Sequence, residues 1–147
     1  MKTDEKTTLG FIFMIYLAES YGLGYVKINE ILKKQKVSVK YLESVVAKVR
    51  AAGLVDARKG SAGGYILSKP PEKISLLDIY ECLNGPVADN QNYNDDNAYR
   101  KTVSNLWSVI NSRLNDYLAS RSLEDLFQDW KKNQTAMPQQ SGGGFYF

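Results

Sequence analysis

Histidine is absent from the 147-residue sequence and cysteine occurs once, at Cys82, and these two shortages exclude several kinds of site. Without histidine there is no imidazole to act as a general base, and most zinc sites lose a ligand. One cysteine cannot form an internal disulfide framework. No nucleophile–base motif is present either, so the sequence predicts no catalytic site and no enzyme. This cysteine usage fits a reducing, cytoplasmic location.

Long hydrophobic runs are also missing. The apolar segment 11–18 follows two acidic residues, lacks a small-residue cleavage site and is far too short to span a bilayer. We therefore expect neither a signal peptide nor a membrane partner. What is present is ordinary for a folded protein: 44% of residues are hydrophobic and 24% are charged, which predicts one domain with a hydrophobic core.

The net charge of +3 is unevenly distributed along the chain. Residues 1–65 contain 11 Lys/Arg and 6 Asp/Glu, whereas residues 66–147 contain 8 and 10. A positive field confined to one half is what a phosphate-binding surface requires, although small domains without such a partner often show a similar asymmetry.

The segment 37–67 has the pattern of a helix followed by a hairpin. Ser38 can cap the first helical turn, and Gly53 can end the helix in a left-handed conformation. Between them an apolar stripe recurs at i, i+3, i+4 and i+7, formed by Leu42, Val45, Val46 and Val49. The open face carries polar or small residues, namely Lys40, Glu43, Ser44 and Ala47.

After Gly53 the period changes to that of two short strands, 54–58 and 65–67, around a glycine-rich tip at 59–64. A helix with an open polar first turn followed by a basic-tipped hairpin is typical of a winged helix-turn-helix. In that motif the helix enters the major groove of duplex DNA and the hairpin reaches the flanking backbone or the minor groove.

Three further helices are expected around this unit. Helix 7–21 is apolar nearly all round, so it is either a central core helix or also packs on another subunit. Helix 26–36 turns its lysines outward, and one or two of them can contact phosphate: Lys27, Lys33, Lys34 and Lys36. Helix 74–83 begins with a capping box of Ser75 and Asp78. Cys82 in that helix is interpreted as a small core residue, with a redox-sensing thiol as the alternative.

The longest expected helix is 98–120. Its apolar residues repeat with spacing 4, 3, 4, 3, which is a coiled-coil seam over two heptads, at Val103, Trp107, Ile110, Leu114 and Tyr117. A winged-helix unit hardly needs another long helix, so we favour a dimer interface over a helix packed back on its own domain. A last short helix is expected from Ser122 to Trp130, again with a capping box.

Two segments have the composition of linkers. The stretch 89–97 is rich in Asn and Asp but lacks the glycine and the glutamate of a calcium-binding hand, which favours a polar loop over a metal site. The end of the chain, with three glycines before three aromatic residues, is either disordered or a docking peptide for a groove. We therefore expect a DNA-binding domain, a polar loop, a dimerisation region and a tail at 1–86, 87–97, 98–132 and 133–147.

Several short segments together resemble one known family. They are Val37-Ser38, Tyr41-Leu42-Glu43, Ala52-Gly53-Leu54-Val55, Gly60 with Gly63-Gly64-Tyr65, Ile74-Ser75-Leu76, Asp78-Ile79 and Asn84-Gly85. In order, spacing and turn chemistry the chain is similar to the Rrf2-type transcription regulators, bacterial winged-helix proteins, over residues 9–127. The resemblance implies a homodimer with a long crossing helix and a palindromic double-stranded DNA operator.

Carried over by position, the resemblance implies DNA contacts on the helix and on the hairpin. The expected contact residues are Ser38, Lys40, Tyr41, Glu43 and Ser44 in the major groove, and Arg58, Lys59, Gly60 and Ser61 at the backbone or minor groove. Glutamate at a reading position accepts from cytosine N4 and repels phosphate, so it selects sequence more than it adds affinity. The family usually has arginine at Lys59, and lysine keeps the charge but loses the planar fork.

A second departure concerns the cofactor. Iron–sulfur members of the family carry three cysteines in the loop before the long helix, and the corresponding loop 86–97 has none. The position that can hold a histidine ligand is Ser104. A cluster needs thiolate ligands, so we expect no cofactor and place the chain in the cysteine-free, CymR-like branch. Members of that branch can respond to a protein partner or a small metabolite.

The sequence thus predicts an α+β, mainly α, winged helix-turn-helix with a long C-terminal dimerisation helix. The predicted function is that of a homodimeric, sequence-specific DNA-binding repressor. The alternative is a winged-helix module that acts through protein contacts, regulated by a partner or a metabolite, without binding DNA.

Overall fold

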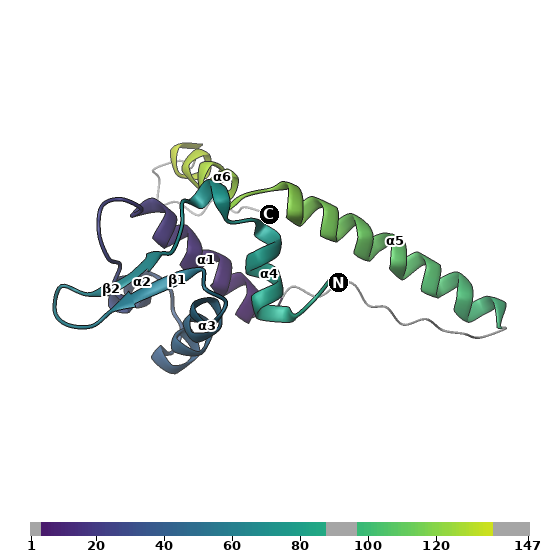
Figure 1. The fold of residues 1–147 in the computed structure, drawn as a ribbon, viewed down its shortest axis with the longest axis horizontal. Helices are drawn as coiled ribbons and strands as arrows, with labels where there is room; N and C mark the ends of the chain where they lie inside the picture. The colour runs from purple at the N-terminus through teal and green to yellow at the C-terminus, as the bar shows by residue number, and fades with distance from the viewer. Residues whose placement is uncertain (1–3, 88–96, 137–147) are drawn as a thin grey trace, which may run out of the picture.

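The computed structural model describes residues 4–87 and 97–136, so most of the expected polar loop at 87–97 and most of the expected tail at 133–147 lie outside the described residues. Within these ranges the chain forms α helices, one short 3-10 helix and a two-stranded sheet (Figure 1). The elements in order are α1 Glu5–Glu19, α2 Ile28–Lys34, α3 Val39–Ala51, β1 Val55–Arg58, β2 Gly64–Leu67, η1 Pro71–Lys73, α4 Leu76–Asn84, α5 Ala98–Ser120 and α6 Leu123–Ala136. The mainly helical winged-helix fold expected from the sequence is confirmed.

Helix α1 is the centre of the core. It contacts α3, α4, α6 and β2, and its side chains Leu9, Phe13, Met14 and Leu17 are buried. A helix that is apolar nearly all round needs burial on several sides, and this one receives it from its own chain. The rings of Phe13 and of Tyr65 on β2 pack edge to face, with their centroids 5.9 Å apart. Its interpretation as a central core helix is therefore correct.

Helix α3 begins and ends as its sequence predicts. The hydroxyl of Ser38 accepts a hydrogen bond from the Tyr41 amide at 3.1 Å, which satisfies one of the free amides of the first turn. At the other end Gly53 adopts φ +78°, and the Leu54 amide donates back to the Val49 carbonyl at 3.2 Å. This is a Schellman ending, which requires a left-handed residue. The four stripe residues from Leu42 to Val49 are buried.

The hairpin is held by a third segment of chain that the sequence did not point to. Strands β1 and β2 pair antiparallel from Val55 with Leu67 to Arg58 with Gly64. Val26, just before α2, forms an isolated bridge with Tyr65, and the two residues exchange both amide–carbonyl bonds at 2.8 Å. A Cβ on Gly64 would lie 2.5 Å from the Val26 carbonyl oxygen, so this close approach requires glycine.

The starts of α4 and α6 are joined side by side. Each helix has its expected capping box, formed by Ser75 with Asp78 and by Ser122 with Asp125. Ser75 and Ser122 form an antiparallel bridge, flanked by hydrogen bonds from the Leu76 amide to the Arg121 carbonyl and from the Leu123 amide to the Ile74 carbonyl. Helix α6 then lies along α1 and runs to Ala136, beyond the end expected at Trp130.

Helix α5 extends away from the rest of the described chain (Figure 1). Leu118 near its C-terminal end is buried and Leu114 is half-buried, whereas the other predicted seam residues are exposed: Val103, Trp107, Ile110 and Tyr117. The alternative of a helix packed back on its own domain therefore holds for its last turns alone.

Replacement of Gly64 by alanine tests the close approach of Val26 to the hairpin. Gly60 is the matched control, because it also has a positive φ, of +104°, but no atom lies within 4 Å of its Cβ position. Gly60→Ala meets backbone strain alone, whereas Gly64→Ala also forces Val26 and Tyr65 apart. We expect Gly64→Ala to lower the free energy of unfolding by about 1–3 kcal/mol more than Gly60→Ala, measured by urea denaturation. Equal losses would contradict this account of the wing.

Candidate nucleic-acid interface

The outer face of α3 presents two charged side chains that project into solvent, Lys40 and Glu43. The neighbouring hydroxyls are engaged locally. Ser38 accepts the Tyr41 amide, and Ser44 donates to the Tyr41 carbonyl at 2.7 Å. Each keeps its complementary capacity, because the Ser38 hydroxyl can still donate and the Ser44 oxygen can still accept.

The side chain of Tyr41 is only partly available for the predicted DNA contact. It is half-buried and packs against the hydrophobic core beside α3. The ring therefore fixes the first turn of the helix more than it extends from the surface. Any contact that Tyr41 makes to a ligand of this face is limited to its exposed edge.

A hollow of about 390 Å³ separates the outer face of α3 from strand β2. It is lined by Glu43, Val46, Ala47, Arg50, Ala51 and Tyr65. Two alanines on successive turns leave space beside the helix, and Arg50 brings a cation to its far end. Arg50 is not among the contact residues predicted from the sequence. A basic residue in the last turn of a helix already has a role in balancing the helix dipole. The hollow shows that the helix face and the hairpin border one surface.

The tip of the hairpin, hereafter the wing tip, consists of Lys59, Gly60 and Ser61, and all three are exposed. Beside it, the guanidinium of Arg58 lies 5.8 Å from the ring centroid of Tyr25, a cation–π arrangement. Tyr25 immediately precedes Val26, so one short segment orients Arg58 and pairs with β2. The wing thus presents Arg58, which lies over the Tyr25 ring, next to the exposed Lys59.

Lys27 is exposed, as expected, and it also contacts the wing. Its ammonium donates to the backbone carbonyl of Ser61 in the wing tip. The outward-facing lysines of the following helix, Lys33 and Lys34, and Lys36 after it are exposed. A single sequence gives no signal for this bond, because Lys27 and Ser61 are 34 residues apart. Lys27 is thus an exposed lysine that also bonds to the wing tip.

Cys82 lies on α4 away from this surface and is half-buried. Its thiol donates to the Ile79 carbonyl at 3.0 Å. Burial, together with the carboxylate of Asp78, raises the pKa of the thiol from its ordinary value of 9.0 to about 11, against a smaller opposing effect of Lys48. A reactive sensor thiol needs a lowered pKa, so the environment of Cys82 favours the core interpretation over redox sensing.

Within residues 4–87 and 97–136 no three side chains of His, Cys, Asp or Glu are grouped so that they could hold a metal ion. Among the helices described there, none combines the length and the apolar character needed to cross a bilayer.

The three features together, a capped helix with an open polar face, a preceding short helix and a basic-tipped hairpin, define a winged helix-turn-helix protein. The sequence matches the family model of Rrf2, an iron-dependent transcriptional regulator, over residues 3–129. The chain belongs to the Rrf2 family of transcriptional regulators, and it is a DNA-binding regulator.

Individual relatives agree in sequence and in structure. The transcriptional regulator CymR of Bacillus subtilis is 34% identical over 126 residues, which cover 86% of this chain and 89% of CymR. The solved structure of CymR, described as the global cysteine regulator of B. subtilis, superposes with a TM-score of 0.77 and 32% identity, covering 88% of this chain and 98% of that one. An IscR structure from T. potens gives a TM-score of 0.74 with 31% identity, covering 95% and 94%.

The iron named in the family description does not fit the residues of this chain. A cysteine-ligated cluster needs several thiolates, and the whole sequence contains one cysteine and no histidine. The raised pKa of Cys82 further disfavours the thiolate that a metal requires. The resemblance to the family therefore carries over to the DNA-binding fold and not to an iron site.

The environment of Cys82 predicts slow thiol chemistry. At pH 8 the thiolate fraction of the native protein should be about a hundredfold lower than that of the unfolded chain, because the pKa is about 11 in place of 9.0. We expect a disulfide reagent to label Cys82 about a hundredfold more slowly in buffer than in urea, with the rate measured by absorbance. Because the native pKa is the higher one, the stability contributed by the protonated thiol is lost as the pH rises from about 9 to about 11. Equal labelling rates would show that Cys82 is accessible and ionised.

Proposed function

We propose that the protein acts as a homodimer that binds a palindromic operator in the cytoplasm and represses transcription by occupying it. Residues 1–86 form the DNA-binding part, and α5 supplies the dimer contact. The observation that supports this most strongly is the apolar surface of α5: Trp107 is 49% exposed, Val103 51% and Tyr117 57%. Monomeric proteins rarely expose a continuous apolar stripe of this kind.

The stripe has the geometry of a helix–helix seam. Val103, Trp107, Ile110, Leu114 and Tyr117 follow one another at spacings of 4, 3, 4 and 3, the repeat that keeps one face toward a partner helix. The helix has 23 residues, and at 1.5 Å per residue it is about 34 Å long, enough for two copies to cross over a long contact. A second copy of the same helix is the simplest partner, because it carries the same stripe.

We assign DNA recognition to the α3 face and the wing. Lys40 and Glu43 project from α3. Lys40 can contact base edges or phosphate in the major groove, and Glu43 can accept from a base, with Ser38, Ser44 and the exposed edge of Tyr41 beside them. Arg58, Lys59, Gly60 and Ser61 meet the flanking backbone or minor groove. Two such units related by a twofold axis read half-sites about one helical turn, or a multiple of it, apart.

Direct titration tests the DNA contacts. The protein is titrated against the DNA upstream of its own gene and a scrambled duplex at two salt concentrations, and footprinting gives the half-site spacing. Lys59→Ala should reduce the slope of log K against log [salt] by about one unit, because it removes one neutralised phosphate. Lys132→Ala, on the exposed side of α6, is the matched control and should leave the slope unchanged.

Glu43→Ala separates sequence reading from affinity in the same titration. A carboxylate at this position accepts a hydrogen bond from a base and repels phosphate. Its loss should therefore reduce the ratio of the affinities for operator and scrambled DNA, while the overall affinity stays similar. Equal weakening on both duplexes would contradict a reading role for Glu43, and unchanged salt slopes in Lys59→Ala would contradict contact by the wing.

The dimer contact is tested by a charge in the seam. Ile110→Arg places a cation in the expected helix–helix contact, whereas Ser112→Arg adds the same charge on the α5 surface outside the stripe. We expect Ile110→Arg to sediment as a monomer and Ser112→Arg to remain a dimer in analytical ultracentrifugation. Ile110 is exposed and is not part of the hydrophobic core, so the fold should persist, as circular dichroism would show. A dimeric Ile110→Arg protein would exclude this seam.

A further inference from the structure

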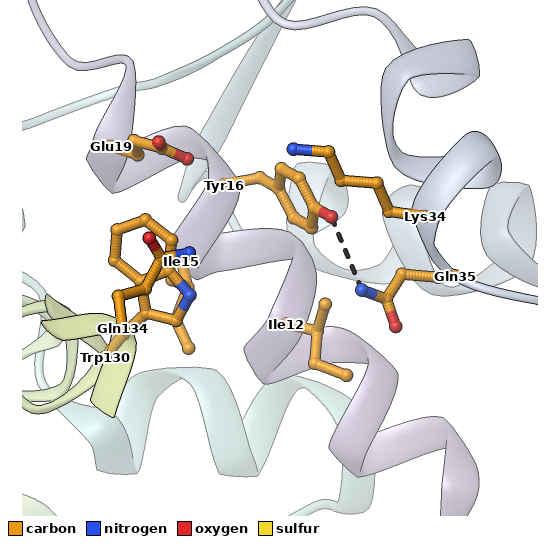
Figure 2. Close-up of a pocket in the computed structure, with 8 residues that line it drawn as sticks. All are labelled: Ile12, Ile15, Tyr16, Glu19, Lys34, Gln35, Trp130 and Gln134. Carbon is orange, nitrogen blue, oxygen red and sulfur yellow. Dashed lines mark hydrogen bonds between the residues drawn. The ribbon is translucent and has the colours of Figure 1, made fainter. Parts of the chain in front are cut away.

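A groove lies between α1, the C-terminal end of α2 and α6. Its volume is about 300 Å³, at the lower end of the range of ~300–1,000 Å³ for small-molecule sites. Figure 2 shows the side chains around it, contributed by α1, by the end of α2 and by α6, which is far from the other two in the sequence. The floor is apolar and consists of Ile12 and Ile15 of α1 and the indole of Trp130 of α6.

The groove carries one cation and one anion that do not pair with each other. Lys34, the last residue of α2, and Glu19, the last residue of α1, both line it and are exposed. Glu19 lies at the C-terminal end of its helix, where the helix dipole disfavours a carboxylate. A ligand ammonium at Glu19 would relieve this repulsion, just as a ligand carboxylate would neutralise Lys34.

Neutral polar groups complete the lining between the two charges. The Gln35 amide donates to the Tyr16 hydroxyl at 3.3 Å and so connects α2 to α1 across the groove. Because Tyr16 uses its oxygen as the acceptor in this bond, its O–H remains a donor for a bound carboxylate. The Gln134 amide, on the last turns of α6, lines the same space.

From this arrangement we propose that the groove binds a small zwitterionic metabolite of the α-amino acid class with an apolar side chain. The ligand carboxylate pairs with Lys34 and the Tyr16 hydroxyl, the ammonium pairs with Glu19, and the side chain packs on Ile12, Ile15 and Trp130. A dipolar ligand is favoured over a singly charged one, because either charge alone would leave the opposite wall unpaired. The volume suits a single amino acid better than a peptide.

The position of the groove connects it to DNA recognition. Gln35 is the C-cap of α2, and the Val37 amide donates to the Gln35 carbonyl at 2.9 Å in the turn that leads to Ser38 and α3. A ligand held by Lys34 therefore contacts the residues next to the turn that orients α3. Binding itself is a property of the protein without DNA, so it stands or falls independently of the proposed operator.

The proposal is tested with the full chain and three probes, L-leucine, L-methionine and L-phenylalanine, at millimolar concentration. The sequence has two tryptophans, so a fluorescence response that the full chain shows and that Trp130→Phe loses is assigned to the groove. We expect at least one probe to change the Trp130 fluorescence with saturation and to raise the melting temperature. The amide and the N-acetyl derivative of that probe each lack one charge and should bind about tenfold or more weakly.

Matched variants locate the binding site. Lys34→Met and Glu19→Gln should weaken binding of the amino acid by about tenfold, whereas Lys33→Met and Glu30→Gln, which alter exposed charges outside the groove, should not. Lys34→Met should also abolish the discrimination between the amino acid and its amide. Absence of any fluorescence or thermal response to all three probes would overturn the proposal. So would binding that survives both groove variants unchanged.

Discussion

The whole arrangement depends on the burial of α1 by its own chain. Helices α3, α4 and α6 and strand β2 contact it, so the positions of the helix-turn-helix, the wing and α6 are all set by packing against the same helix. The contact of Phe13 with Tyr65 is central, because Tyr65 also exchanges two backbone hydrogen bonds with Val26. A displacement of α1 would therefore move the wing and the start of α2 together. Close packing of this kind transmits displacement rather than absorbing it.

The wing owes its geometry to a segment of three residues, Tyr25 to Lys27. Tyr25 orients Arg58, Val26 pairs with Tyr65, and Lys27 bonds to the carbonyl of Ser61. These contacts come directly before α2, so the hairpin is coupled to the helix-turn-helix at its first residue. A two-stranded hairpin alone is marginally stable in water, and the third segment supplies what it lacks. Preorganisation of this kind reduces the ordering cost when a surface binds its partner.

Local signals in the sequence predicted most of the elements. The cap at Ser38, the glycine at Gly53 and the capping box at Ser75 each act within a few residues, so their chemistry can be read directly. Contacts between distant segments could not be read in this way. The bond from Lys27 to Ser61 and the groove between α1, α2 and α6 depend on how the chain folds back, and nothing in a single sequence marks those pairs. The packing of the Tyr41 ring against the core is likewise a contact that the local sequence pattern does not mark.

The junction between α5 and α6 makes α5 a lever. Its base is fixed by the bridge between Ser75 and Ser122, and by Arg121, which bonds Asp129 at 2.9 Å and lies over the ring of Tyr117. The rest of the helix extends away from the body of its own chain, so a rotation of only ~10° at this pivot would move its far end by about 6 Å over a length of about 34 Å. Trp130 and Gln134, two walls of the groove, lie on α6 just beyond the pivot. A small displacement of α6 is thus magnified at the N-terminal end of α5. The length of α5 therefore makes its junction with α6 the place where a small rotation produces the largest movement.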